Sequence, residues 1–159
     1  MESNSPSIIF SMLVLLMLIG IQMIEAGSVR SKNVSSVFLR GLATLTISLV
    51  CSWICGYMFT HTSGHFFLGY NSDYLTLNKV PDKEYYDWVL YSCISSLCSA
   101  IVASSMSERT HITGHLILSL FVSLLIFPAS AHWIWHPQGW LSVQGCSDLG
   151  KINWIKNFN

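Results

Sequence analysis

Hydrophobic residues occur along this chain in four long runs, which are separated by shorter polar stretches. The runs are Ile8–Ile24 with an extension towards Val29, Gly41–Thr60, Trp88–Ser107 and Ile112–Ala131. They contain no aspartate, glutamate, lysine or arginine, apart from Glu25 in the extension of the first. About 20 helical residues, at roughly 1.5 Å each, are needed to cross a hydrocarbon core about 30 Å thick. The pattern therefore predicts four transmembrane helices, at about residues 8–29, 37–60, 88–107 and 111–131.

The composition agrees with a membrane protein. The 159 residues are 52% hydrophobic and 10% charged, with a mean hydropathy of +0.50 and no formal net charge, whereas about a quarter of the residues in soluble domains are charged. We therefore predict an all-α fold, a polytopic membrane helical bundle in the lipid bilayer. Because the chain has no basic stripe, no nucleic-acid partner is expected. A cleaved signal peptide is the less favoured reading of the first run, which is long and follows Glu2 rather than a basic residue.

Basic residues between the first two runs predict the orientation of the chain. Arg30 and Lys32 lie in this short stretch, and Arg40 follows them. Because basic residues collect on the cytoplasmic side of short membrane loops, we expect the stretch in the cytosol and both termini outside the cell. The sequon at Asn33 offers an independent check, since a glycan there would require the opposite orientation.

Small residues dominate the third run. Ser92, Ser96, Ala100 and Ser104 recur at every fourth position, with a second such series beside them. Small faces let membrane helices approach closely, so the pattern predicts a central place in the bundle. The same hydroxyl groups could also line a polar path, and the sequence leaves both interpretations open.

The six histidines form three pairs, each with three residues between the partners. The pairs are His61 and His65, His111 and His115, and His132 and His136. Partners at this spacing share a helix face and could hold zinc, but a structural zinc site needs four ligands. The predicted topology also places the second pair on the opposite side of the membrane from the other two. We therefore expect no metal and no cofactor, and no acid–base or nucleophile constellation indicates an enzyme.

Three tryptophans lie close together in the stretch HWIWHPQGW, residues 132–140, at the outer end of the fourth run. Tryptophan rings anchor membrane proteins at the interface between lipid and water. Their faces also attract cations, by about 0.5–2 kcal/mol depending on desolvation. The stretch is therefore either an interfacial anchor or a surface that collects a small cation.

Several longer motifs resemble one protein family. IEAGSVRSKNV, SERTHIT and AHWIWHPQGWL are similar to segments of ammonium transporters, the Amt branch of the Amt/Rh channels, and Gly56-Tyr57 and FFLGY fit the same pattern. The resemblance runs in order from about Ile8 to Asp148. It implies a partial ammonium-transporter fold, the N-terminal portion with about four of the family's eleven transmembrane helices. It also implies ammonium or ammonia as the substrate and a homo- or hetero-trimer in the plasma membrane.

The resemblance also implies candidate substrate-binding residues. Trp135 matches the outer-vestibule tryptophan that helps to recruit ammonium by a cation–π contact. Asp148 matches the aspartate that opens the family's fifth helix, although the residues after it depart from the family's pattern. Leu90 and Ile94 fall at the positions of two pore phenylalanines, and Ile94 takes the outer gate position. Aliphatic side chains there lack the ring face that binds a cation.

We therefore expect transmembrane ammonium or ammonia transport, with a partial transporter domain at residues 1–150 and a divergent C-terminal tail at residues 151–159. Inverted-repeat transporters place the path between both halves, so this chain is expected to be incomplete as a channel on its own. Two alternatives stay open. The chain could be a non-conducting truncated subunit that associates with full-length ammonium transporters, or a generic four-helix membrane adaptor.

Overall fold

A computed structural model of the chain describes residues 5–62, 69, 76, 84–106 and 110–145. The elements in these residues are all helical, and no strand occurs among them. Within the described residues, four helices are long and apolar enough to cross a membrane. They cover Ser7–Ser28, Ser31–His61, Tyr85–Ser104 and Ile112–Val143. The predicted number of spans and the predicted fold class are thereby confirmed.

The first and third spans are single helices, α1 (Ser5–Ser28) and α4 (Glu84–Ser104). The other two are composite. The second span begins with a 3-10 turn, η1 (Ser31–Asn33), and continues through α2 (Val34–Cys51), the π-helical η2 (Ser52–Gly56) and α3 (Tyr57–His61). The fourth contains α5 (Ile112–Phe121), the π-helical η4 (Val122–Ile126), α6 (Phe127–Trp135) and the single turn α7 (Trp140–Val143).

The π-helical segment η4 ends at Ile126, two residues before Pro128, which lies in the first turn of α6. Proline lacks a backbone N–H, and its ring clashes with the carbonyl four residues earlier, so an α-helix has to widen or bend beside it. A π-helical segment supplies that widening. The chain can therefore continue through Pro128 to Trp135 without ending the span.

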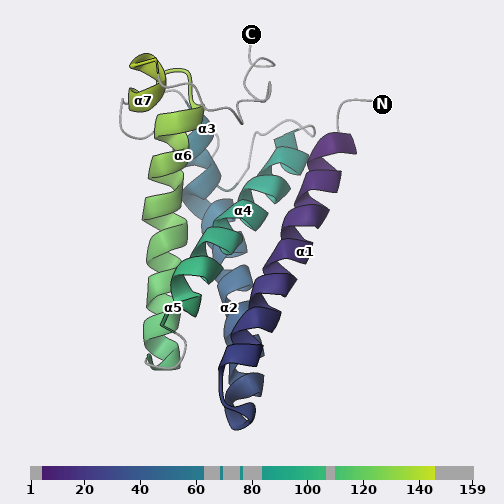
Figure 1. Ribbon diagram of the computed structural model, residues 1–159. Helices are drawn as coiled ribbons and strands as arrows, with labels where there is room; N and C mark the ends of the chain where they lie inside the picture. Colours follow the sequence, from purple (N-terminus) through teal and green to yellow (C-terminus); the bar gives the residue numbers. More distant parts are fainter. Residues whose placement is uncertain (1–4, 63–68, 70–75, 77–83, 107–109, 146–159) are drawn as a thin grey trace.

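Figure 1 shows the spans as one bundle, in which α1 and α4 lie side by side. The helix α4 packs against α1, α2 and α5, so the central place predicted from its small residues is confirmed. The helix α3 packs against α6. The start of α1 lies at the same end of the bundle as α3 and α7, whereas the connection from α1 to α2 lies at the opposite end. These are called the α7 end and the η1 end below.

The bundle is apolar on the outside and polar within. Leu16 of α1 is 70% exposed and Ile117 of α5 is 69% exposed, whereas Ser95 and Ser99 of α4 are completely buried. Large aliphatic side chains on the outer surface suit contact with lipid. Leaving a buried hydroxyl group unpaired in hydrocarbon is costly. The Ser99 hydroxyl has partners, whereas the Ser95 hydroxyl has none among the described residues.

Candidate functional site

A cluster of aromatic side chains joins the second, third and fourth spans towards the α7 end. Its buried members are Tyr57 of α3, Tyr91 of α4, and Phe127 and Ala131 of α6. The ring of Tyr91 lies edge-on to that of Tyr57, with centroids 6.1 Å apart, and its centroid is 5.0 Å from that of Phe127. Edge-on and tilted contacts suit the charge distribution of aromatic rings. The cluster therefore fixes how the three spans meet.

The hydroxyl group of Tyr91 closes a small polar network inside this cluster. It donates to the carbonyl of Gly56 over 3.1 Å and accepts from the Thr60 hydroxyl over 3.0 Å. Gly56 is the last residue of the π-helical η2. The network thus places a polar group of α4 at the junction between η2 and α3. A Cβ atom on Gly56 would lie 3.3 Å from the Tyr91 oxygen, so the two helices approach closely at this point.

Trp135, the strongest candidate from sequence, packs against the edge of this cluster. It is the last residue of α6, and its ring stands at 77° to that of Phe127 with centroids 6.4 Å apart. Ile94 of α4 packs against the same cluster, so the structure brings these two candidates to one site. Leu90 is buried in α4 outside the cluster, and Asp148 lies outside the described residues.

Histidines surround the α7 side of the cluster. His132 is completely buried, and its Nδ1 lies 3.1 Å from the carbonyl oxygen of Thr60. Because a carbonyl only accepts hydrogen bonds, Nδ1 carries the proton, and Nε2 is left as an acceptor without a partner in the described part of the chain. His61 stacks on Tyr57 with centroids 4.1 Å apart, and His136 stacks on His132 at 4.6 Å.

A seam of buried hydroxyl groups continues from the aromatic cluster towards the η1 end. The hydroxyls of Ser99 in α4 and Ser123 in η4 lie 2.8 Å apart, and Ser99 also contacts the Ser95 carbonyl over 3.0 Å. Nearer the η1 end, Thr44 of α2 lies 2.9 Å from Nε2 of His115 in α5. These contacts show that the small residues of the third run both pack closely and hold polar groups in the interior.

The described residues contain no group of three or more histidine, cysteine, aspartate or glutamate side chains placed to hold a metal ion. What the site offers instead is aromatic surface. The rings of Tyr57, Tyr91 and Phe127 are buried, whereas Trp135 is partly exposed at the end of its helix. Trp135 can therefore present its ring to a cation that arrives at the α7 end of the bundle.

The sequence predicted Trp135 as a candidate, but it did not predict that Tyr57, Tyr91 and Phe127 form the cluster against which Trp135 packs. Tyr91 and Phe127 sit inside long apolar runs, where a single aromatic residue does not stand out. In the sequence, Gly56-Tyr57 stands out only as part of a family motif. A helix-face comparison of the second and fourth spans would have placed Tyr57 and Phe127 among buried residues, but it would not have paired them with Tyr91.

Fold and site together define a helical integral membrane protein with an aromatic, polar interior. The chain matches the model of the Ammonium Transporter Family over residues 7–156, and it belongs to this family.

Three curated relatives show how far the similarity extends. The chain is 32% identical to Ammonium transporter 1 member 3 of Solanum lycopersicum, over 87% of this chain and 30% of that protein. It is 30% identical to Ammonium transporter 3 of Dictyostelium discoideum, over 86% of this chain and 31% of the relative. The chain is 28% identical to Ammonium transporter Amt2 of Archaeoglobus fulgidus, over 86% of this chain and 29% of that protein. The chain thus spans about a third of the length of these relatives.

Proposed function

We propose that the chain takes part in transmembrane ammonium or ammonia transport and that Trp135 recruits ammonium at the α7 end. Membership of the family supports the substrate. The observation that carries the proposal is the edge-on contact between Trp135 and Phe127, which orients a partly exposed indole at the end of a span. A cation on the indole face would gain about 0.5–2 kcal/mol.

The other candidate residues take different parts in this proposal. Ile94 packs under the aromatic cluster and offers no ring face, so ammonium recruited by Trp135 is held more weakly than between two aromatic residues. Leu90 lies on the same helix, one turn earlier, and supplies only apolar surface. Asp148 is proposed to match the aspartate that opens the family's fifth helix, although the residues after it depart from the family's pattern.

The orientation and assembly are also proposals. Arg30 and Lys32 are exposed at the η1 end, which supports a cytosolic place for that end by the positive-inside rule. Trp135 and both termini would then face outwards at the plasma membrane. The oligomer is proposed to be a homo- or hetero-trimer, by membership of the family.

Uptake of labelled methylammonium into liposomes that contain the full chain tests the function. An incomplete channel is expected to give no uptake on its own. If the chain does form a path, uptake should saturate, and Trp135→Leu should raise the half-saturating concentration roughly two- to thirtyfold, the equivalent of one cation–π contact. Trp133→Leu is the matched control, because Trp133 packs against Trp140 rather than against Phe127. Equal effects of the two substitutions would contradict a specific role for Trp135.

A second candidate is a non-conducting subunit that associates with full-length ammonium transporters. It is tested by adding the chain to liposomes with a full-length relative. Co-purification with that relative and a fall in its uptake, with no uptake by the chain alone, would support this candidate. If Trp135→Leu changes neither uptake nor association with the relative, the result would instead favour a generic membrane adaptor.

A further inference from the structure

His136 directly follows Trp135, at the point where α6 ends, and its side chain is half-buried. The backbone N–H of Gln138 donates to Nδ1 of His136 over 3.2 Å. Because a backbone N–H can only donate, Nδ1 is the acceptor and carries no proton, and the neutral ring holds its single proton on Nε2. This hydrogen bond therefore requires the uncharged form of His136.

The same hydrogen bond is part of the turn that joins α6 to α7. In this turn the N–H of Gly139 also donates to the His136 carbonyl, over 2.9 Å. A proton on Nδ1 would point at the N–H of Gln138, so the two groups would repel each other and their hydrogen bond would be lost. Taking up a proton therefore changes both the charge of His136 and the bonding of the turn directly after Trp135.

The described elements that pack closely against α6 supply no carboxylate that could balance a proton on His136. These elements are α3, η4 and α7, and none of them contains aspartate or glutamate. Asp87 of α4 accepts a hydrogen bond from α1 instead. The titratable side chains grouped around His136 are His132, which stacks on it at 4.6 Å, His61 and Tyr57 of α3, and Tyr91 of α4. A positive charge on His136 would therefore act on its surroundings without a counter-charge from these helices.

Trp135 is the residue that such a charge would affect first. Trp135 and His136 are consecutive, so their Cα atoms are about 3.8 Å apart. This separation is well inside the Debye length of about 8 Å at physiological ionic strength, so salt screens the charge only partly. A proton on His136 would therefore place a positive charge beside the indole ring at the α7 end, and a cation approaching that ring would be repelled.

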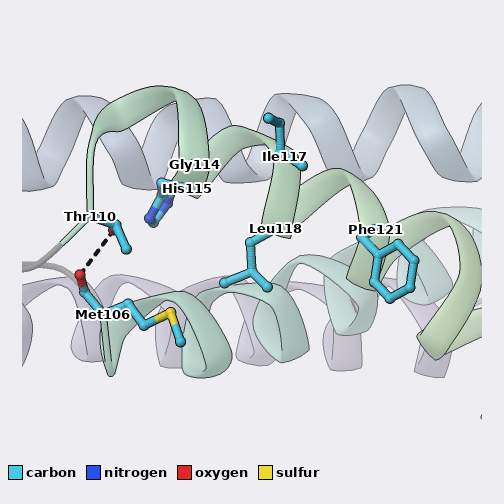
Figure 2. Close-up of a pocket in the computed structure, with 7 residues that line it drawn as sticks. All are labelled: Met106, Thr110, Gly114, His115, Ile117, Leu118 and Phe121. Carbon is cyan, nitrogen blue, oxygen red and sulfur yellow. Dashed lines mark hydrogen bonds between the residues drawn. The ribbon is translucent and has the colours of Figure 1, made fainter.

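Two other histidines lie at the opposite, η1 end of the bundle. His115 is 3% exposed and lies beside a pocket of about 360 Å³, whose lining also includes Met106 and Phe121 (Figure 2). His111 comes directly before α5, and its side chain is exposed. The pocket shares no residue with the aromatic cluster. A proton on His111 would be too far from Trp135 to act on a cation there, so this residue provides a control within the same chain.

We propose that His136 makes the ammonium-recruiting site at Trp135 sensitive to pH. The site collects ammonium while His136 is neutral and releases it when Nδ1 takes up a proton. This inference rests on the proposed function, because it concerns the regulation of the same site. Histidine is the side chain that ordinarily changes charge between about pH 5 and pH 8. Methylammonium, an alkylammonium ion like the lysine side chain, stays charged below about pH 9, so a pH effect on its binding comes from the protein.

Binding of methylammonium to the full chain in lipid nanodiscs tests the proposal. The indole N–H signals of a chain with ¹⁵N-labelled tryptophan report binding by nuclear magnetic resonance, and the signal of Trp135 is the one that Trp135→Leu removes. We expect methylammonium to shift this signal at about pH 8 and to bind roughly three- to tenfold more weakly at about pH 4, as for two like charges near a protein surface. No shift at any pH would overturn the proposed function and this inference with it. Equal affinity at every pH would overturn only the role of His136.

Three variants assign the effect to one side chain. His136→Gln cannot take up a proton, and its side-chain oxygen can still accept a hydrogen bond, so its affinity should be the same at acid and neutral pH. His136→Arg carries a permanent charge and should bind methylammonium at about pH 8 as weakly as the unaltered chain does at about pH 4. His111→Gln, at the η1 end, should keep the full pH dependence. If His136→Gln also keeps it, the proton acts on another group and the proposal is wrong.

Discussion

At the scale of single residues, the interior of this bundle is held by hydroxyl groups as much as by apolar packing. The tyrosine network at the end of η2 joins α4 to the second span through one side chain, because Tyr91 bonds both Gly56 and Thr60. Sequence patterns predicted that α4 would be central. They could not predict this network, since hydrogen bonds between spans depend on the rotation of each helix, which spacing alone leaves open.

Tyr91→Phe removes the oxygen from that network and keeps the ring. We expect the free energy of unfolding to fall by about 1 kcal/mol, because the hydrogen bonds of the tyrosine oxygen are lost. The loss is limited because the Thr60 hydroxyl can still donate to the Gly56 carbonyl over 3.0 Å. Unfolding by a denaturing detergent, followed by far-ultraviolet circular dichroism, measures the change. Tyr86→Phe on the exposed face of the same helix should stay within about 0.5 kcal/mol.

The hydroxyl groups of Ser99 and Ser123 join α4 to the fourth span over 2.8 Å. A double-mutant cycle with Ser99→Ala and Ser123→Ala should give a coupling energy of about 0.6 kcal/mol, the average for hydrogen bonds between membrane helices. The same unfolding measurement supplies all four values. Zero coupling would mean that each serine bonds only the backbone of its own helix, and the seam would then be a packing feature.

At the scale of elements, charge-free runs predicted the four spans because charged residues are costly in hydrocarbon. The runs did not predict where helices change type. The helix α4 begins one turn before its apolar run, at Glu84, and Ser7 of α1 donates to Asp87 over 2.9 Å. Acidic residues are favourable at a helix start, so polar residues can extend a span beyond its hydrophobic part. Neither π-helical segment was predicted, since periodicity does not register one extra residue per turn.

The turn between α6 and α7 depends on Gly139. A Cβ there would lie 2.2 Å from the carbonyl oxygen of His132 and 2.6 Å from that of Trp133, and these backbone atoms cannot move aside cheaply. We therefore expect Gly139→Ala to cost about 1–3 kcal/mol of stability and to separate Trp133 from Trp140, which tryptophan fluorescence reports. Gly114→Ala is the contrasting change. Its Cβ meets open space, and it should stabilise α5 by up to about 1 kcal/mol.

At the scale of the whole molecule, the bundle is organised by its two ends. The α7 end holds the aromatic cluster and the stacked histidines, whereas the η1 end carries exposed Arg30 and Lys32 and the pocket beside His115. Buried hydroxyl contacts lie in the interior between them. Sequence reasoning anticipated the tryptophan at one end and the basic turn at the other, because each is a local signal. The pocket could not be anticipated, since it forms between segments that meet only in the folded bundle.

The exposed basic turn makes the orientation testable. If the η1 end is cytosolic, the sequon at Asn33 stays without a glycan even though its side chain is exposed. Short tags that carry their own sequon, fused to the N-terminus and to the C-terminus, should both be glycosylated in microsomes, because both ends are then lumenal. A mass shift at Asn33, or glycans on neither tag, would mean that the chain has the opposite orientation in the membrane. Trp135 would then face the cytosol, and the proposed recruitment of external ammonium would have to be abandoned.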